Sequence, residues 1–320
     1  MHVVATAKIS EKHQQALRTM FSDFEFYFFD SMQSLWQEPE VIERAQVLLT
    51  YGEDLNEDVL KSFVNLRWIQ VLSAGIDRMP HAALLERGIV VTNARGIHAI
   101  PMAEYAVGVI LSHVRRLPQM YQFQREKRWD RSIRVEELYG KTIVIVGTGA
   151  IGQAIAARLL AFGVEVHGVN RHGKDAPGFQ KITPIEAIDQ ALAKADGVIV
   201  TVPLTAESRH LFQRDRFEAM KRGAFFVNMG RGGVVEESHL LEALDHGIIS
   251  YAYLDVFETE PLPDNHPFWD HPRIFLTPHV SGRSPYYMAR ALEIFKENVP
   301  YFLAGDIAGL KNLVDLTKGY

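Results

Sequence analysis

Short apolar runs alternate with helix-like segments along the first hundred residues. The runs are rich in β-branched and aromatic residues and are bounded by polar residues, which is typical of buried strands. They are HVVATAKI, FEFYFFD, AQVLLTY, RWIQVLS and GIVVTNA. Segments such as EKHQQALRTMF and NEDVLKSFV stand between them and favour helices. This alternation predicts a parallel sheet covered on both faces, so we expect one α/β domain here.

A longer helix is predicted between His98 and Trp129, where apolar residues first recur at helical spacing and charged residues follow. Pro101 suits the first turn of this helix, because the amide that proline lacks is one that a first turn leaves unused. Pro118 predicts that the helix ends or bends near that position.

The alternation of strands and helices begins again at Lys141. After about Ser284, the segment YYMARALEIFKENVPYFLAG has the pattern of an amphipathic helix with no domain of its own, so we expect it to return to the first domain. The sequence therefore predicts two doubly wound parallel-sheet domains of the α/β class, with 99–283 inserted between 1–98 and 284–320. The strands expected in the inserted part are KTIVIV, EVHGVN, GVIVTVP, AFFVNMG, SYAYLDV and IFLTPH.

Composition narrows the classes of function. The sequence has no cysteine, which excludes disulfides, thiol catalysis and cysteine-ligated metals, and which fits a reducing, cytoplasmic setting. We expect no metal site. The net charge of −5 disfavours a nucleic-acid partner, which would need a basic face. No signal peptide and no membrane partner are expected, because the N-terminus lacks a basic region leading into an apolar core and no apolar run approaches roughly 18 residues.

A glycine-rich turn follows the first strand of the inserted domain. The stretch IVIVGTGAIGQAIA is a strand, then G-x-G-x-x-G, then an alanine-rich helix, which is the context that a dinucleotide-binding loop needs. Gly147 makes the tight turn, Gly149 lets a pyrophosphate approach the backbone, and Gly152 allows close packing of helix on strand. The amides of Ala150 and Ile151 open the helix and face the anion. The alternative is a tight turn without a ligand.

The next strand ends in GVNRHGK, where a dinucleotide-binding fold usually carries an acid for the ribose of NAD. Asn170 stands there instead, followed by the cations Arg171, His172 and Lys174. A carboxylate would repel the 2′-phosphate of NADP, whereas Asn170 can donate hydrogen bonds and Arg171 suits a phosphate. We therefore predict NADP as the preferred cofactor, with NAD possible. The alternative is a solvated basic loop with ordinary NAD binding.

Three later stretches resemble a known family. VNMGRGGVVEESHLLEAL, LDVFETEPLP and FLTPHVSG, in register with ELYGKTIVIVGTGAIG, resemble the D-isomer-specific 2-hydroxyacid dehydrogenases, with the glyoxylate/hydroxypyruvate reductase and D-glycerate dehydrogenase branches looking closest. The resemblance is densest from Pro101 to Gly282. It implies a flavodoxin-like substrate domain (1–98 plus 284–320), an inserted Rossmann cofactor domain (99–283) and a homodimer.

The resemblance also implies roles for individual residues. Arg231 would hold the substrate carboxylate and polarise the carbonyl, and Glu260 would pair with His279, which would deliver the proton. Asp255 would bond the nicotinamide carboxamide, although a helix-capping role is the alternative. The stretch LSAGID, Leu72 to Asp77, would bind the substrate carboxylate through Ser73, Ala74 and Gly75. The remaining cofactor contacts would come from Thr201, Val202, Pro203, Met229, Ser281 and Gly282.

The chemistry of such a reaction needs these residue types independently. Reduction of a 2-oxo acid brings a hydride to carbon and a proton to oxygen, and an imidazolium such as that of His279 is a good donor near neutral pH. A carboxylate orients the imidazole, and an arginine clamps a planar carboxylate with two hydrogen bonds. We therefore predict NADPH-dependent reduction of glyoxylate, hydroxypyruvate or a similar 2-oxo acid to the D-2-hydroxy acid.

Two other classes of function stay open. A nucleotide-sensing corepressor uses a similar fold for binding, and phosphonate- or formate-type NAD-dependent dehydrogenases share the cofactor domain. Formate dehydrogenases, however, pair the active histidine with a glutamine where this sequence has Glu260. The sequence ends at Tyr320 without a C-terminal effector-binding extension, so we do not expect a long phosphoglycerate dehydrogenase.

Overall fold

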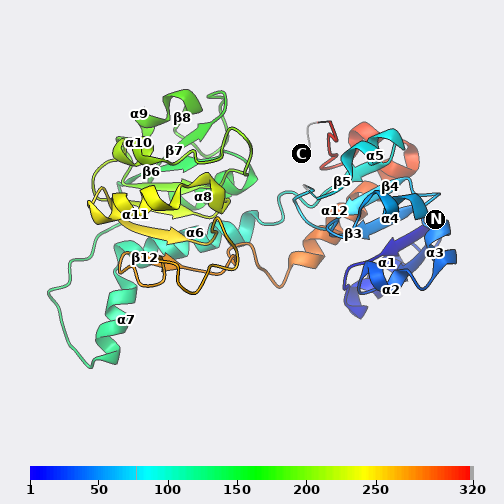
Figure 1. Cartoon of the computed structure of the whole chain (residues 1–320), viewed down its shortest axis with the longest axis horizontal. Coiled ribbons are helices and arrows are strands. Elements are labelled where there is room, and N and C mark those ends of the chain that lie inside the picture. The colour runs from blue at the N-terminus through cyan, green and yellow to red at the C-terminus, as the bar shows by residue number, and fades with distance from the viewer. Residues whose placement is uncertain (77, 318–320) are drawn as a thin grey trace. The chain divides into compact units, whose positions relative to one another are not determined.

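The computed structural model describes residues 1–76 and 78–317, which fall into two compact units. Asp77 of the predicted LSAGID stretch and 318–320 of the predicted C-terminal segment lie outside the described residues. The first unit comprises Met1–Ile97 and the described residues from Ser284 onward, and the second comprises His98–Arg283. Each unit has one all-parallel sheet with helices on both faces (Figure 1), which confirms the predicted fold class.

The sheet of the first unit has five strands in the order β2-β1-β3-β4-β5, which is the flavodoxin-like order. Its strands are β1 (His2–Ala5), β2 (Glu25–Phe28), β3 (Val47–Thr50), β4 (Trp68–Val71) and β5 (Val90–Thr92). Its helices are α1 (Glu11–Met20), α2 (Met32–Leu35), α3 (Pro39–Arg44), α4 (Glu57–Ser62), α5 (His81–Glu86), α12 (Tyr287–Ala304) and the 3-10 turn η3 (Ile307–Gly309).

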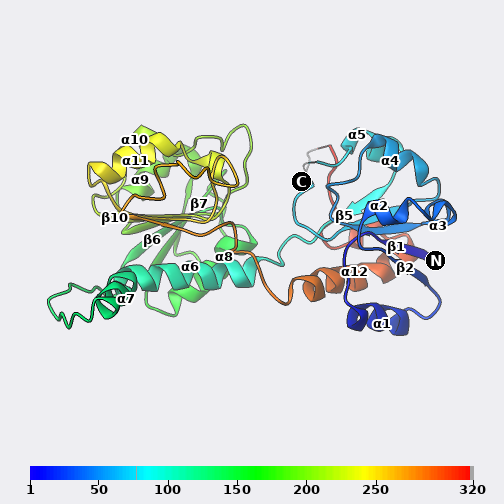
Figure 2. The same cartoon turned by 60° about the horizontal axis from the view of Figure 1, so that its bottom comes forward.

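Helices α1 and α12 cover one face of this sheet, and α2 to α5 cover the other (Figure 2). The indole ring of Trp68 lies in the core under α12, with its centroid 5.2 Å from the ring of Phe295 and 4.9 Å from that of Phe302. The C-terminal helix therefore completes a core that the first hundred residues begin, because its apolar face has no other sheet to bury it.

The sheet of the second unit has seven strands in the order β12-β11-β10-β9-β6-β7-β8, the Rossmann order with one strand added at an edge. Its strands are β6 (Thr142–Val146), β7 (Glu165–Asn170), β8 (Lys181–Pro184), β9 (Gly197–Val200), β10 (Ala224–Asn228), β11 (Ile249–Leu254) and β12 (Ile274–Leu276). Its helices are α6 (Ala99–Val114), α7 (Leu117–Arg125), α8 (Ala150–Leu160), α9 (Ile188–Leu192), α10 (Arg214–Glu218) and α11 (Glu237–Asp245), with η1 (Ile185–Ala187) and η2 (Gly232–Val234).

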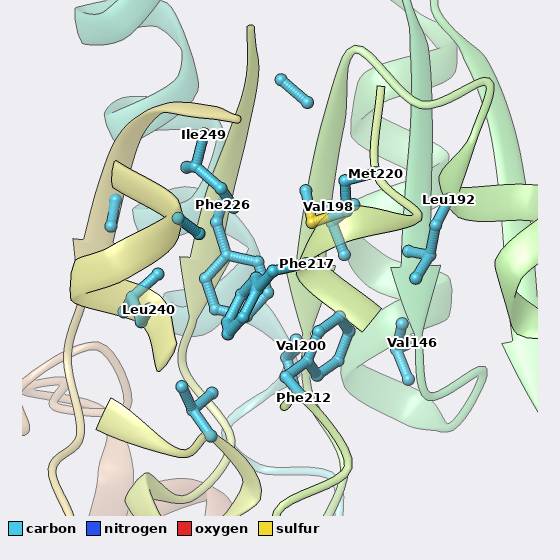
Figure 3. Close-up of a cluster of buried hydrophobic side chains, with 14 of the residues drawn as sticks. Val146, Leu192, Val198, Val200, Phe212, Phe217, Met220, Phe226, Leu240 and Ile249 are labelled. Atoms are coloured by element: carbon cyan, nitrogen blue, oxygen red, sulfur yellow. The ribbon is translucent and has the colours of Figure 1, made fainter. Parts of the chain in front are cut away.

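Alternate residues of each central strand pack into two different cores, as the pleat of a strand requires. On β10, Phe226 joins Phe212 and Phe217 under α10 and α11 (Figure 3), whereas its neighbours Phe225 and Val227 pack against α6 and α8. Both faces are buried, which explains why the strands of this unit are almost continuously apolar in sequence.

Two details differ from the predicted elements. The long helix α6 ends at Val114, and Arg116 adopts a left-handed backbone conformation with φ of 54°. Pro118 therefore lies in the first turn of a separate helix, α7, where its ring fits, instead of ending α6 itself. Strand β8 was not predicted, because it lies at the edge of the sheet and Thr183 is its one buried residue.

None of the helices in the described ranges combines the length and the apolar composition that a membrane crossing needs.

Candidate active site

The predicted site residues of the second unit follow successive strands of one parallel sheet. Because the strands run in the same direction, their carboxyl ends meet at one edge. The loops that follow β6 and β9 flank the point where the strand order reverses, which is where such sheets bind ligands. Along that edge, the strands β12, β11, β10, β9, β6 and β7 lead to His279, Asp255, Arg231, Thr201, Gly147 and Asn170, in this order.

The glycine loop has the shape that a pyrophosphate needs. Gly147 has a φ of 107°, and a Cβ at Gly152 would overlap the carbonyl oxygen of Gly147. A Cβ at Gly149 would meet nothing within 4 Å, so this face of the loop is open. Helix α8 starts at Ala150, and the first amides of a helix have no partner inside it. The amides of Ala150 and Ile151 can therefore hold an anion, and this loop fits a dinucleotide.

The loop after β9 braces the glycine turn. The hydroxyl of Thr201 donates to the carbonyl oxygens of Val146 and Gly147, at 3.2 and 3.1 Å. Val202 and Pro203 follow it along the same edge. Met229, predicted as a cofactor contact, has its side chain buried in the core beneath α6 and α8. Only its backbone can approach a ligand, because the pleat turns the side chain inward.

The side chain of Asn170 is used inside the protein. Its Nδ2 group donates to the hydroxyl of Thr148 at 3.0 Å and to the carbonyl of Lys174 at 2.7 Å. Its Oδ1 accepts from the amides of His172 and Lys174. Both hydrogens that we expected Asn170 to offer to a ribose are thus engaged, and the residue instead fixes the basic loop against the glycine turn.

Arg171 extends from this loop into solvent. Its guanidinium lies 3.5 Å from the carboxylate of Glu207, and both side chains are about two-thirds exposed, at 66% and 67%. Such an exposed pair is weak and is easily replaced by a stronger anion. Arg171 is therefore available to a phosphate, but Glu207 competes for it.

His279 and Glu260 form a close pair. Nδ1 of the ring lies 2.8 Å from Oε2 of Glu260, while Oε1 accepts from the amide of Phe257 at 3.0 Å. The carboxylate can only accept, so Nδ1 carries the hydrogen and Nε2 is left as the atom that exchanges a proton with a ligand. The His279 side chain is 50% exposed, so the ring is open to a ligand.

Arg231 directly follows β10 and the sharp turn at Gly230. Its Nη1 donates to the carbonyl of Gly230 at 2.8 Å, and its own carbonyl accepts from Asn228 at 3.1 Å. A Cβ at Gly232 would overlap the backbone of Phe257. This glycine therefore lets the Arg231 turn lie directly against the segment that leads to Glu260.

His98 connects Arg231 with His279 in space. Its Nδ1 lies 3.2 Å from the carbonyl oxygen of Gly282. Burial lowers the pKa of His98, and the charges of Arg231 and His279 lower it further, against the hydrogen bond to Gly282, which raises it. Arg231 and His279 therefore both lie within electrostatic reach of His98.

Asp255 is fully buried beneath the His279 turn, with an exposed fraction of 0%. Its Oδ1 accepts from the hydroxyl of Thr277 at 2.6 Å and from the amide of Val280 at 2.9 Å, and its Oδ2 accepts from the amide of Ser281 at 2.9 Å. These three bonds explain the burial of the carboxylate without any ligand. The predicted contact with the nicotinamide stays a prediction.

Residues 107–281 match the family model described as D-isomer specific 2-hydroxyacid dehydrogenase, NAD binding domain. The chain belongs to this dehydrogenase family. It is 34% identical to the glyoxylate reductase of Thermofilum pendens over 83% of this chain and 80% of that protein. It is also 34% identical to the D-3-phosphoglycerate dehydrogenase of Methanocaldococcus jannaschii, over 87% of this chain but only 53% of that protein, so it spans about half the length of that relative.

Solved structures of this dehydrogenase family match almost the whole of this chain. A D-isomer specific 2-hydroxyacid dehydrogenase family protein from Aeromonas salmonicida is 33% identical, with a TM-score of 0.84 and 98% of each chain covered. An NADPH-dependent glyoxylate/hydroxypyruvate reductase from Sinorhizobium meliloti, in complex with NADP and sulfate, is 26% identical, with a TM-score of 0.80 and 99% of each chain covered.

The first unit of this family member carries a loop of open amides after β4. The hydroxyl of Ser73 donates to the carbonyl of Gly75 at 3.0 Å, and Asn93 donates to the carbonyl of Ala74 at 2.9 Å. Within the described residues, the amides of Ala74 and Gly75 donate to no protein acceptor. Consecutive open amides form a concavity that suits an anion such as a carboxylate.

Four contacts of the site join residues that are distant in the sequence, and the sequence did not predict them. Thr277 donates to Asp255, and Glu207 lies close to Arg171. Gly232 lies directly against the backbone of Phe257. The contact of Tyr105 with Thr277 joins positions 172 residues apart.

Proposed function

We propose that this family member reduces a small 2-oxo acid, such as glyoxylate or hydroxypyruvate, to the D-2-hydroxy acid with NADPH. The observation that carries the proposal is the His279–Glu260 pair at 2.8 Å, on the same sheet edge as the open glycine loop and Arg231. The names of the Thermofilum and Sinorhizobium relatives agree with this substrate class.

In this proposal the cofactor lies across the switch point of the second unit. Gly147 to Gly152 hold the pyrophosphate, and Arg171, with His172 and Lys174 beside it, holds the 2′-phosphate. Asn170 keeps that basic loop in place. The bound reduced nicotinamide supplies the hydride. The other residues that line the cofactor are Thr201, Val202, Pro203, Asp255, Ser281, Gly282 and the backbone of Met229.

The protein's own groups handle the proton and the carboxylate. Nε2 of His279 delivers the proton to the carbonyl oxygen, while Glu260 orients the ring through Nδ1. Arg231 clamps the carboxylate with its planar fork and stabilises negative charge on the oxygen. The amides of the Ser73–Gly75 loop bind the same carboxylate.

The proposal assigns 1–98 plus 284–320 to the substrate and 99–283 to the cofactor, and it includes a homodimer in the cytoplasm. The dimer is supported by apolar side chains on α7 and the segment that follows. Tyr121, Tyr139 and Trp129 are largely exposed there, with Trp129 at 92%. Large exposed aromatic side chains on one stretch of the chain are typical of a surface that another chain covers.

A panel of 2-oxo acids assayed with both nicotinamides tests the proposal. We expect oxidation of NADPH with glyoxylate or hydroxypyruvate and a lower kcat/KM with NADH. The product from hydroxypyruvate, which unlike the product from glyoxylate is chiral, should be the D isomer on a chiral column. Phosphohydroxypyruvate is a necessary member of the panel, because some relatives are phosphoglycerate dehydrogenases. Absence of turnover with every 2-oxo acid, while the protein binds NADPH, would refute the proposal.

A further inference from the structure

A continuous line of hydrogen bonds joins helix α6 to the turn that carries His279. The hydroxyl of Tyr105, on α6, lies 2.8 Å from the hydroxyl oxygen of Thr277, and that hydroxyl lies 2.6 Å from Oδ1 of Asp255. Asp255 is fully buried and Tyr105 is partly buried, so water competes little for these bonds.

The direction of each bond follows from the donors available. A carboxylate accepts only, so the single hydrogen of the Thr277 hydroxyl is donated to Asp255. The oxygen of Thr277 can then only accept from Tyr105, which makes the phenol the donor at the start of the line. Burial raises the pKa of Tyr105 to about 12, so the phenol keeps this hydrogen near neutral pH.

The backbone at the end of the line needs support. His279 has a φ of 51°, a left-handed conformation that is uncommon for a residue other than glycine and that persists only where neighbouring contacts enforce it. The carboxylate of Asp255 holds the two amides that follow, those of Val280 and Ser281, while its carbonyl accepts from the amide of His279 at 2.9 Å. Asp255 thus fixes the direction in which the imidazole leaves the backbone.

We propose that Tyr105 is a positioning residue for the proton donor, acting on the His279 turn through Thr277 and Asp255. Only the kinetic test of this inference depends on the proposed function, because that test measures turnover. In this line of hydrogen bonds Tyr105 contacts neither the reacting atoms nor His279. Tyr105 holds the hydroxyl of Thr277, and Thr277 in turn holds the carboxylate of Asp255. Loss of the phenol hydroxyl leaves the protein folded but lets the turn sample conformations in which Nε2 of His279 is misdirected.

Kinetics of matched variants separate positioning from simple stability. Tyr105→Phe removes one hydroxyl, and we expect kcat to fall roughly three- to tenfold with little change in KM for NADPH, since about one hydrogen bond of alignment is lost. Thr277→Val should reduce kcat more than Thr277→Ser, which keeps the hydroxyl. The double variant Tyr105→Phe/Thr277→Val should be no worse than Thr277→Val alone, because both changes break the same line.

Tyr253→Phe is the control. Tyr253 is a buried tyrosine on β11 of the same unit, and its hydroxyl makes no hydrogen bond within the described residues, so kcat should stay at the wild-type value. Equal kcat in Tyr105→Phe and Tyr253→Phe, or additive effects in the double variant, would overturn the inference.

A second readout does not depend on turnover. In protein with isotope-labelled histidine, the ring resonances of His279, assigned by their loss in His279→Gln, should shift or broaden in Tyr105→Phe and not in Tyr253→Phe. An unchanged His279 signal in Tyr105→Phe contradicts the positioning role even if no substrate is found. Conversely, if the wild type has no turnover but the His279 signal still shifts in Tyr105→Phe, the proposed function is refuted and the positioning role is supported.

Discussion

The imidazole of His279 is held from two directions. Glu260 fixes the ring through Nδ1, and the buried Asp255 fixes the backbone on either side of the ring. The proposed role as proton donor needs both constraints, because the ring must carry its proton on the outward nitrogen and present it at one position. The sequence motifs identified the ring and its carboxylate, but the backbone support depends on contacts that no motif contains.

Glu207 should weaken the proposed preference for NADP. At 3.5 Å from Arg171, its carboxylate competes with a 2′-phosphate for the guanidinium and repels it. We expect Glu207→Gln to raise the ratio of kcat/KM for NADPH over NADH several-fold. Glu186→Gln makes the same charge change on an exposed turn of the same unit and serves as the control. If the ratio of kcat/KM for NADPH over NADH is unchanged in Glu207→Gln, Arg171 does not bind the 2′-phosphate.

The turn η2 and the segment from Phe257 to Glu260 depend on one glycine. A Cβ at Gly232 would overlap the backbone of Phe257, so Gly232→Ala must push the Arg231 turn away from the Glu260 segment. We expect at least a tenfold loss of kcat/KM together with lower thermal stability, since backbone cannot yield as a flexible side chain can.

Gly108→Ala is the matched control for that substitution. Gly108 lies in α6, and a Cβ there would meet nothing within 4 Å. The change should therefore stabilise the protein by about 0.5–1 kcal/mol through better helix propensity, without loss of activity. Similar effects of the two substitutions in thermal melts and steady-state assays would disprove the packing argument for Gly232.

Helix α6 also carries a buried histidine that makes folding depend on pH. Burial, with a contribution from Arg116, lowers the pKa of His113 from 6.5 to about 4, and its Nδ1 has no hydrogen-bond partner in the described structure. Below pH 6.5 His113 binds a proton in the unfolded chain but stays neutral in the folded protein. The contribution of His113 to the free energy of unfolding is therefore fully present above pH 6.5 and is lost as the pH falls toward about 4.

His113→Leu should remove this dependence. Between pH 7 and pH 5 we expect the wild type to lose about 2 kcal/mol of unfolding free energy that the variant keeps, as measured by urea denaturation at both pH values. Leucine has a similar volume, and the site packs against Phe225 and Tyr253. Parallel losses in wild type and variant would mean that His113 already carries a proton in the folded state.

The elements that were predicted well are those whose burial produces a local run of apolar residues in the sequence. The apolar runs of β6, β9 and β10 identify central strands because both of their faces are covered. Edge strand β8 has one buried residue and leaves no such pattern. The same limit applies to the site: local motifs contain His279 and Arg231, whereas the bond from Tyr105 to Thr277 exists only after the chain has folded.

The order of the chain makes the first unit depend on its last helix. Residues His98–Arg283 form the second unit before α12 is reached, and α12 then supplies the side of the first core that faces Trp68. We expected this return because the helix has no domain of its own to pack on. The five strands of the first sheet all precede α6, but one face of that sheet is only partly covered without α12.

Substitution of Phe295 tests that dependence. Phe295 is fully buried against Trp68, so Phe295→Ala should lower the stability of the first unit by about 3–5 kcal/mol. In hydrogen exchange, the amides of β4 should lose protection while those of β6 keep it. Leu303→Ala on the exposed face of the same helix should change neither. Equal loss of protection in both sheets would contradict two separately stabilised units.

In the proposed function the second unit supplies a dinucleotide loop, a clamp for a carboxylate and a proton donor, and the proposed proton donor most directly decides the chemistry. The decisive measurement is the rate of NADPH oxidation by hydroxypyruvate in a single turnover, compared between the wild type and His279→Gln at equal saturation with NADPH. We predict a rate roughly 10²–10⁴-fold lower in His279→Gln with unchanged NADPH affinity. A variant that oxidises NADPH within a factor of a few of the wild-type rate would show that the proton comes from another group.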